Sequence, residues 1–145
     1  MSDLRRVVVD TSTLVGAVLR PNSVPRHAFL AVVRLYELCV SQATLDELHE
    51  VMQRPKFDRY VPRQERLDFC MLVTERARLW DVDAASTQAA DGACRDAKDA
   101  KFLALALACQ AVALVSSDDD LLILHPWNNV PILTPAAFLT TLSTH

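Results

Sequence analysis

Glycine is unusually scarce in this chain of 145 residues. Only Gly16 and Gly92 are present. Neither the glycine-rich phosphate loop of nucleotide hydrolases nor the GxGxxG turn of dinucleotide-binding proteins can be built from them. If a protein without such a loop binds phosphate groups, a metal ion is the obvious substitute for the loop. The shortage of glycine therefore excludes two common α/β chemistries and leaves metal-assisted phosphate chemistry open.

Cysteine pairs are also missing. The four cysteines are widely spaced, and no two of them form a CxxC motif. Structural zinc sites and disulfide frameworks depend on closer, patterned spacing, so neither is expected. We predict reduced and mostly buried thiols at Cys39, Cys70, Cys94 and Cys109.

Long hydrophobic runs are absent. The longest, residues 102–115, is shorter than the ~20 residues that a membrane helix needs. Near the start, Arg5 and Arg6 are followed by only three valines before Asp10, which does not resemble a secretory signal. Because 51% of the residues are hydrophobic, disorder is not expected either. We predict a single domain over residues 1–145, in the cytoplasm and without a membrane partner.

Basic residues are nearly absent from the second part of the chain. Residues 1–80 hold 12 Lys/Arg and 10 Asp/Glu, whereas residues 81–145 hold 3 and 8. The densest basic stretch is residues 54–66, and the densest acidic one is residues 118–120. This separation suits a metal pocket beside a phosphate-binding surface. Solvated surface charge would explain the same counts equally well.

Strand and helix patterns alternate along the chain. The unbroken run Val7–Val9, which leads into Asp10, is typical of a strand buried on both faces. A parallel sheet covered by helices on both faces is therefore predicted, an α/β fold, although the pattern does not determine the strand order. Strands are predicted at 5–10, 36–40, 79–82, 113–115 and 130–133, and helices at 25–35, 42–53, 62–78, 96–110, 119–125 and 135–142, with residues 83–95 mostly loop.

Several acidic residues fall where an α/β sheet forms its sites. Asp10 ends the first strand and Asp118 follows the fourth, while Glu47 lies in a helix after the second. Asp96 and Asp99 are three residues apart at the start of a helix and should share a face. The carboxyl ends of neighbouring strands meet at one edge of the sheet, so these acids can converge there. Singly, each has a simpler role as a helix cap, a charge at a helix end or a surface acid.

Converging carboxylates repel one another unless a cation neutralises them. Mg²⁺ and Mn²⁺ prefer oxygen ligands, and a pair of such ions can activate a water and stabilise the leaving oxygen of a phosphodiester. Other α/β chemistries lack their motifs. A haloacid-type phosphatase needs an aspartate where Ser12 stands, a receiver domain needs a lysine beyond Lys101, and the GxSxG elbow of serine hydrolases is absent.

Five segments, in order and at family spacing, resemble PIN-domain ribonucleases. The nearest likeness is to the toxin components of bacterial and archaeal toxin–antitoxin systems. The matching segments are residues 7–15 (VVVDTSTLV), 43–57, 96–103 (DAKDAKFL), 115–122 (VSSDDDLL) and 130–139. One such segment alone is a weak signal, whereas five together are specific.

The resemblance implies a three-layer α/β/α domain whose five-stranded parallel sheet has the order 3-2-1-4-5. It also implies RNA cleavage with Mg²⁺ or Mn²⁺ as cofactor, a homodimer or higher homo-oligomer, and a cognate antitoxin protein. The motif positions make Asp10, Glu47, Asp99 and Asp118 the catalytic, metal-binding residues, with Asp96 and Asp120 peripheral.

Two positions depart from the family pattern. Ser12 stands where Asn is common and Ser116 where Thr is common. Both keep a polar group, so we expect them to orient a carboxylate or a water.

The basic segment offers a surface for RNA. Aromatic residues interleave with its cations, which suits phosphate contacts and base stacking. A solvated connection with two core aromatics would give the same pattern. The predicted RNA-binding residues are Arg54, Lys56, Arg59 and Arg63.

Two other functions remain open at this point. One is a catalytically silent PIN module that binds RNA or a protein. The other is a metal-dependent nuclease of rRNA or tRNA maturation that is not a toxin.

Overall fold

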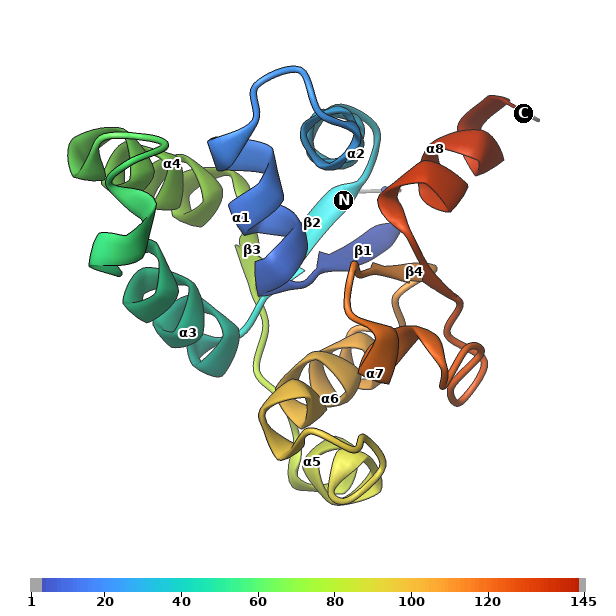
Figure 1. Ribbon diagram of the computed structural model, residues 1–145. Coiled ribbons are helices and arrows are strands. Elements are labelled where there is room, and N and C mark those ends of the chain that lie inside the picture. Colours follow the sequence, from blue (N-terminus) through green and yellow to red (C-terminus); the bar gives the residue numbers. More distant parts are fainter. Residues whose placement is uncertain (1–3, 144–145) are drawn as a thin grey trace.

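Five short parallel strands form the centre of the structure (Figure 1), a computed structural model that describes residues 4–143. Their order is β3-β2-β1-β4-β5, so the fold class and the strand order implied by the resemblance are both confirmed. In the middle of the sheet, Val9 of β1 pairs with Val115 of β4, which brings the carboxyl ends of these strands side by side. The strands are β1 (Arg6–Val9), β2 (Glu37–Val40), β3 (Arg78–Leu79), β4 (Ala113–Val115) and β5 (Ile132–Leu133).

Helices cover both faces of the sheet (Figure 1). One face packs against α1 (Thr11–Leu19), α2 (Val24–Leu35), α3 (Gln42–Met52), α4 (Arg63–Arg76) and α8 (Pro135–Ser143). The other packs against α5 (Ala84–Ala90), α6 (Ala100–Ala108) and α7 (Asp119–Leu122). Two 3₁₀ turns, η1 (Pro55–Phe57) and η2 (Ala97–Asp99), precede α4 and α6.

The valine run of β1 explains why the sheet has two cores. Val7 and Val9 belong to the core on the first face, whereas Val8 belongs to the core on the second. Side chains alternate across a strand, so a strand covered on both faces must be apolar at every position. Residues 102–106 of α6 are all buried for a related reason, because that helix lies between the sheet and α5.

Helix α1 was not among the predicted elements. A helix after Asp10 was considered only in the alternative in which Asp10 acts as a helix cap. Its start is fixed by the Asp10 side chain, which accepts a hydrogen bond from the Thr13 backbone N–H at 2.9 Å. Gly16 lies in the middle of this helix, and a Cβ there would sit 3.2 Å from Cγ of Pro25. The glycine therefore lets α1 and α2 approach closely. Glycine also lowers helix propensity, so this helix is hard to recognise in the sequence.

Two other expectations are wrong in detail. The deep helix starts at Ala100, because η2 occupies its predicted first turn, so Asp96 and Asp99 flank a 3₁₀ turn rather than sharing a helix face. Residues 84–90 form α5 within a segment assigned mostly to loop.

The cysteines behave as predicted. All four thiols are free and buried. Among the described residues no helix is both long and apolar enough to cross a bilayer.

Candidate metal centre

A pocket of about 380 Å³ opens at the carboxyl edge of the sheet, where β1 and β4 end. Residues from α3 and from the segment before α6 complete its walls. The four carboxylates predicted to be catalytic all line it, as does one acid predicted to be peripheral. These residues are Asp10, Glu47, Asp99, Asp118 and Asp96.

Asp10 lies at the bottom of this pocket and is only 2% exposed. Its carboxylate accepts hydrogen bonds from the Thr13 backbone N–H, from the Ser12 hydroxyl at 3.0 and 3.1 Å, and from the Ser116 hydroxyl. Burial raises the pKa of Asp10, and the hydrogen bonds from Ser116, Thr13 and Ser12 oppose that rise. The same residue is thus a helix cap and an acid of the site.

Ser116 joins the ends of β1 and β4. Its hydroxyl donates to Asp10 Oδ2 and accepts from the backbone N–H of Asp118 at 2.9 Å. Asp118 in turn caps α7, since its Oδ1 accepts from the Asp120 N–H at 2.9 Å. Ser12 and Ser116, the two positions that depart from the family pattern, therefore both hold the carboxylate of Asp10.

Three acids form a tight group on one side of the pocket. Asp99, Asp118 and Asp120 each offer a carboxylate oxygen, and these oxygens lie within 4.8 Å of one another. Asp99 Oδ2 is buried and has no hydrogen-bond partner in the described part of the chain. Asp120, expected at the periphery, is thus closely associated with two of the predicted ligands.

The electrostatic cost of this group appears in the pKa of Asp99. Burial, followed by the hydrogen bond and the charge of Asp118 and the charges of Asp96 and Asp10, raises that pKa to about 7. A divalent cation would remove this repulsion. The donors are all carboxylate oxygens, which Mg²⁺ and Mn²⁺ prefer over softer ligands. The residues present therefore fit a hard divalent ion.

Glu47 faces the pocket from α3 but already has two partners. Its Oε1 accepts from Lys101 Nζ at 2.7 Å, and its Oε2 accepts from the Thr11 hydroxyl. Neither Lys101 nor Thr11 was predicted as a site residue. Glu47 and Lys101 are 54 positions apart in the chain. Only the folded arrangement brings them together, so no local pattern could have revealed the pair.

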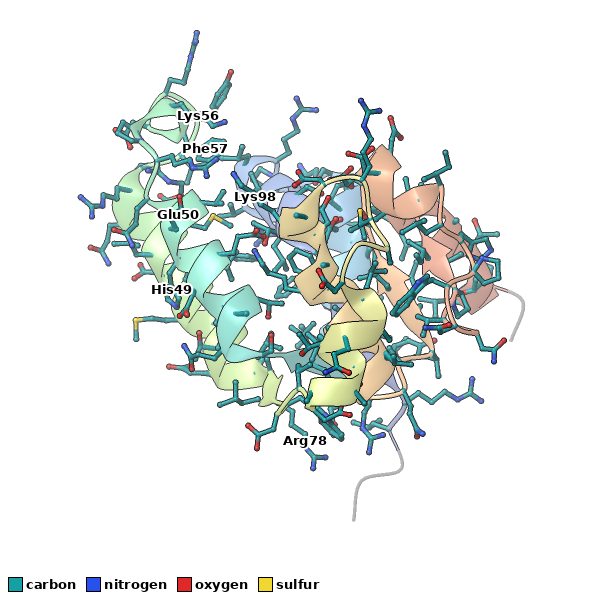
Figure 2. All side chains as sticks on the ribbon, turned by 90° about the horizontal axis from the view of Figure 1, so that it is seen from below. His49, Glu50, Lys56, Phe57, Arg78 and Lys98 are labelled. Carbon is teal, nitrogen blue, oxygen red and sulfur yellow. The ribbon has the colours of Figure 1, made fainter. Side chains whose placement is uncertain are left out.

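The basic segment divides into two parts. Arg54 and Lys56 line the pocket together with Phe57, and Lys98 lines it from the segment before α6. Figure 2 shows Lys56, Phe57 and Lys98 at the same end of the molecule. The other two predicted RNA-binding residues lie outside the pocket: Arg59 covers the ring of Tyr60 at 5.4 Å, and Arg63 bonds Gln53 at 3.3 Å.

Arg66, the last basic residue of the stretch, points into the protein and is fully buried. Its guanidinium donates to the carbonyls of Met52 at 2.8 Å, of Arg54 at 3.3 Å and of Val61, and it pairs with Asp58 at 2.8 Å. Four bonds from one side chain tie the connection between α3 and α4 to the body of the protein. Arg66 thereby supports the wall of the pocket that Arg54, Lys56 and Phe57 form.

Comparison with known proteins agrees with the fold. The family model of the PIN domain matches residues 6–120, a span that contains all six acids of the candidate site. No curated protein matches the chain.

Solved structures share the fold at low sequence identity. VapBC2 from Rickettsia felis, bound to a DNA fragment from its promoter, matches with a TM-score of 0.64 at 16% identity, over 89% of this chain and 98% of that one. PAE2754 from Pyrobaculum aerophilum matches with a TM-score of 0.67 at 14% identity, over 96% and 90%. VapC20 from Mycobacterium tuberculosis, a toxin that cleaves the sarcin–ricin loop, matches with a TM-score of 0.56 at 14% identity, over 86% and 98%.

Proposed function

Because the chain belongs to the PIN-domain family, we propose that it is a metal-dependent ribonuclease and the toxin of a toxin–antitoxin pair. The observation that carries the proposal is the tight group of Asp99, Asp118 and Asp120, whose carboxylate oxygens lie within 4.8 Å of one another. A buried oxygen without a partner, Oδ2 of Asp99, belongs to this group. Such an arrangement is costly without a cation and favourable with one.

The proposed ligands of one or two Mg²⁺ or Mn²⁺ ions are Asp10, Glu47, Asp99 and Asp118, directly or through water, with Asp96 and Asp120 peripheral. When bound, such ions supply an activated water and positive charge for the leaving oxygen of a phosphodiester. Asp99 and Asp118 are well placed for direct contact, since an oxygen of each lies within 4.8 Å of the other and of one from Asp120. Asp10 is better suited to an indirect role, because its carboxylate already accepts hydrogen bonds from three donors.

Ser12 and Ser116 are the proposed positioning residues. Both donate to Asp10, and Ser116 also accepts from the Asp118 backbone. These bonds hold the two strand ends in one arrangement. An ion held by both strand ends needs that arrangement to persist.

The rim of the pocket is the proposed RNA surface. Arg54, Lys56 and Lys98 line it and would attract phosphates, and Phe57 offers a ring for stacking a base. Arg59 and Arg63 would extend the same basic surface beyond the pocket.

The proposed partners are an RNA substrate, a cognate antitoxin and a second copy of the chain, all in the cytoplasm. The similar Rickettsia felis structure contains VapBC2 on promoter DNA, and the similar Mycobacterium tuberculosis protein is a toxin.

The direct test is cleavage of single-stranded RNA with Mn²⁺ by the wild type and by Asp10→Asn and Asp99→Asn. Each substitution should reduce the rate by orders of magnitude, because a proposed ligand is lost. Asp68→Asn on the exposed side of α4 is the matched control and should leave the rate unchanged. Equal cleavage by all four proteins would refute the proposal.

Two further measurements separate the alternatives. Calorimetry with Mn²⁺ tests for a silent binding module, which need not take up the ion at micromolar to millimolar concentrations. Neighbouring genes separate a toxin from a maturation nuclease. A small gene encoding a DNA-binding N-terminal part and an amphipathic tail would favour the toxin.

A further inference from the structure

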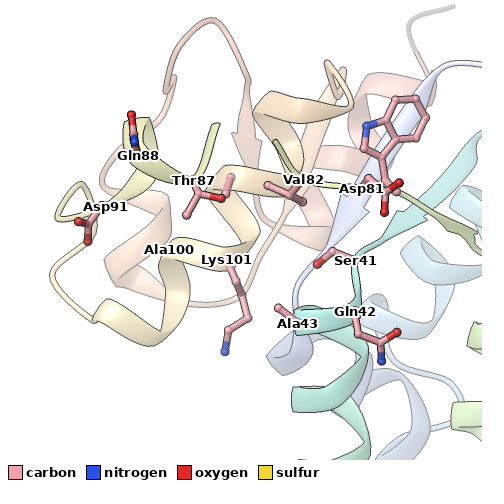
Figure 3. A pocket seen from close by; sticks show the side chains of 12 residues that line it. Ser41, Gln42, Ala43, Asp81, Val82, Thr87, Gln88, Asp91, Ala100 and Lys101 are labelled. Carbon is pink, nitrogen blue, oxygen red and sulfur yellow. The ribbon is translucent and has the colours of Figure 1, made fainter. Parts of the chain in front are cut away.

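A second pocket, of about 450 Å³, lies beside the first turn of α6 (Figure 3). Ala100, Lys101 and Ala104 line it, whereas Asp99 and Phe102 line the metal pocket. These residues interleave along one helix turn, so the two pockets lie on different faces of the same turn. The start of α3, the segment after β3 and helix α5 form the other walls.

The surface of this second pocket is apolar in its floor and polar at its rim. Val82, Ala100 and Ala104 are small, and they leave room for a flat group. The neutral side chains of Thr87 and Gln88 stand at the rim and offer both donors and acceptors. This combination suits a planar ring with a hydrogen-bonding edge.

Charge further narrows the choice of ligand. Asp81 and Asp91 line the pocket, and neither takes part in an ion pair within the described residues. Of the described lining residues only Lys101 is basic, and it is already paired with Glu47 at 2.7 Å. Arg6 and Arg78 stack on Trp80 at this pocket, but the two unpaired carboxylates of the lining favour an uncharged group that presents N–H donors over a phosphate.

The two pockets are joined along the surface. A hollow between them is lined by Ala43 and Lys101, which also line the second pocket, and by Glu47 and Arg54, which also line the metal pocket. An RNA strand with a phosphate at the metal centre can therefore pass the Glu47–Lys101 pair and place a neighbouring base in the second pocket. Unpaired bases of RNA are commonly splayed out and read in this way.

We propose that the second pocket binds an unpaired nucleobase next to the cleaved bond, and that it prefers guanine. Guanine presents N1–H and the N2 amino group side by side, which a carboxylate such as Asp91 or Asp81 can accept together. Uracil presents one N–H between two carbonyls, and a carboxylate repels those oxygens. The proposal rests on the proposed ribonuclease function for its biological meaning, but the binding itself requires neither metal nor catalysis.

The test uses nucleosides, which carry no phosphate, and a chelator that removes metal. Trp80 lines the pocket and reports binding by its fluorescence, and Trp127→Phe removes the other tryptophan. Guanosine should change the emission saturably and bind at least about fivefold more tightly than uridine, with adenosine and cytidine between them. Asp81→Asn and Asp91→Asn should weaken guanosine binding, by about tenfold for the acid that contacts the base. Asp68→Asn on α4 is the control for loss of charge and should have no effect.

Several outcomes would overturn the proposal. They are a failure of all four nucleosides to bind, equal binding of all four, and guanosine binding that neither acid affects. Binding of the peptide Gly-Arg-Gly in place of guanosine would also overturn it, and would make the pocket a contact for a partner protein. Because both acids are exposed, their substitution should not prevent folding, and Gln88→Ala provides an independent variant.

The outcomes of the nucleoside test and of the cleavage test are independent of each other. Cleavage that depends on Asp99, without nucleoside binding, would refute the base pocket and leave the ribonuclease. Guanosine binding without cleavage would leave the pocket as part of a silent RNA-binding module.

Discussion

The ammonium group of Lys101 lies 2.7 Å from the carboxylate of Glu47, at the edge of the acidic pocket. Both side chains are largely buried, with 26% and 18% of their surface exposed. The pair is therefore less screened than a surface ion pair. Lys101 neutralises the one predicted ligand that comes from α3 and therefore competes with a metal ion for Oε1 of Glu47.

Lys101→Met should accordingly tighten the binding of Mn²⁺ to the metal-free protein. Loss of the competing ammonium frees Oε1 of Glu47, and we expect affinity to rise about tenfold, equivalent to ~1.4 kcal/mol. Isothermal titration calorimetry measures the change. Lys98→Met is the matched control, because it removes a positive charge from the pocket wall without breaking the pair. An equal gain in both variants would show that general electrostatics, and not the pair, limits the affinity.

The affinity for Mn²⁺ should depend on pH near neutrality. Burial and neighbouring acids raise the pKa of Asp99 to about 7, and a metal ion must displace that proton to bind. Binding should therefore weaken as the pH falls from 8 to 6, and uptake of the ion should release about half a proton at pH 7, where Asp99 is half protonated. Calorimetry in two buffers of different ionisation enthalpy counts the protons. Asp99→Asn should lose this release, and a release that persists in the variant would assign the proton to another group.

The metal-free protein should lose stability as the pH rises. The folded pKa of Asp99 is about 7, against 3.8 for an ordinary aspartate, so the folded state binds more protons than the unfolded state between these values. The contribution is fully present below pH 4 and is lost as the pH approaches and passes 7. Asp99→Asn should thus stabilise the metal-free protein at pH 7.5 by about 1 kcal/mol, after allowance for screening by solvent. Urea unfolding with a chelator measures it, and a destabilised variant would contradict the assigned repulsion.

Arg66→Met should be strongly destabilising, although Arg66 lies in a stretch whose sequence predicts a basic surface. The guanidinium donates to three backbone carbonyls and pairs with Asp58, and its removal leaves buried carbonyls without donors. We expect a loss of about 3–5 kcal/mol in the free energy of unfolding. Arg63→Met, on the exposed side of the same helix, should change it by less than about 0.5 kcal/mol. Similar losses in both variants would show that helix propensity is responsible.

The sequence predicted the location of the candidate site better than it predicted its internal contacts. The valine run placed Asp10 at a strand end, and Asp118 was placed by the same reasoning. Both aspartates also prove to be helix caps, so the two interpretations of each were compatible. A cap fixes the orientation of a carboxylate, and that orientation is also what a metal ligand requires.

Contacts between distant residues could not be predicted from local patterns. Spacing within a helix says nothing about Lys101 meeting Glu47, nor about Arg66 turning inward among neighbours that face solvent. The helix over residues 11–19 was missed for a different reason. Its β-branched residues and Gly16 lower helix propensity, and packing against α2 compensates for that in the folded chain.

Ser116 allows the roles of positioning and binding to be separated. Among the described residues its hydroxyl alone bonds both the Asp10 carboxylate and the Asp118 backbone, so Ser116→Ala should loosen the orientation of these two aspartates. We expect cleavage and Mn²⁺ affinity to fall by about 10–100-fold, which is usual when a group that orients ligands is lost. Ser116→Thr keeps the hydroxyl and occurs commonly in PIN domains, so it should restore both.

A purely structural role for Ser116 would give a different result. Loss of stability alone would lower the unfolding midpoint without changing the Mn²⁺ affinity of the folded protein. The matched control is Ser117→Ala, which removes a neighbouring hydroxyl that contacts Thr13 at 3.2 Å but neither carboxylate. If Ser117→Ala lowers metal affinity as much as Ser116→Ala does, the Ser116 bonds to Asp10 and Asp118 are not what organises the site.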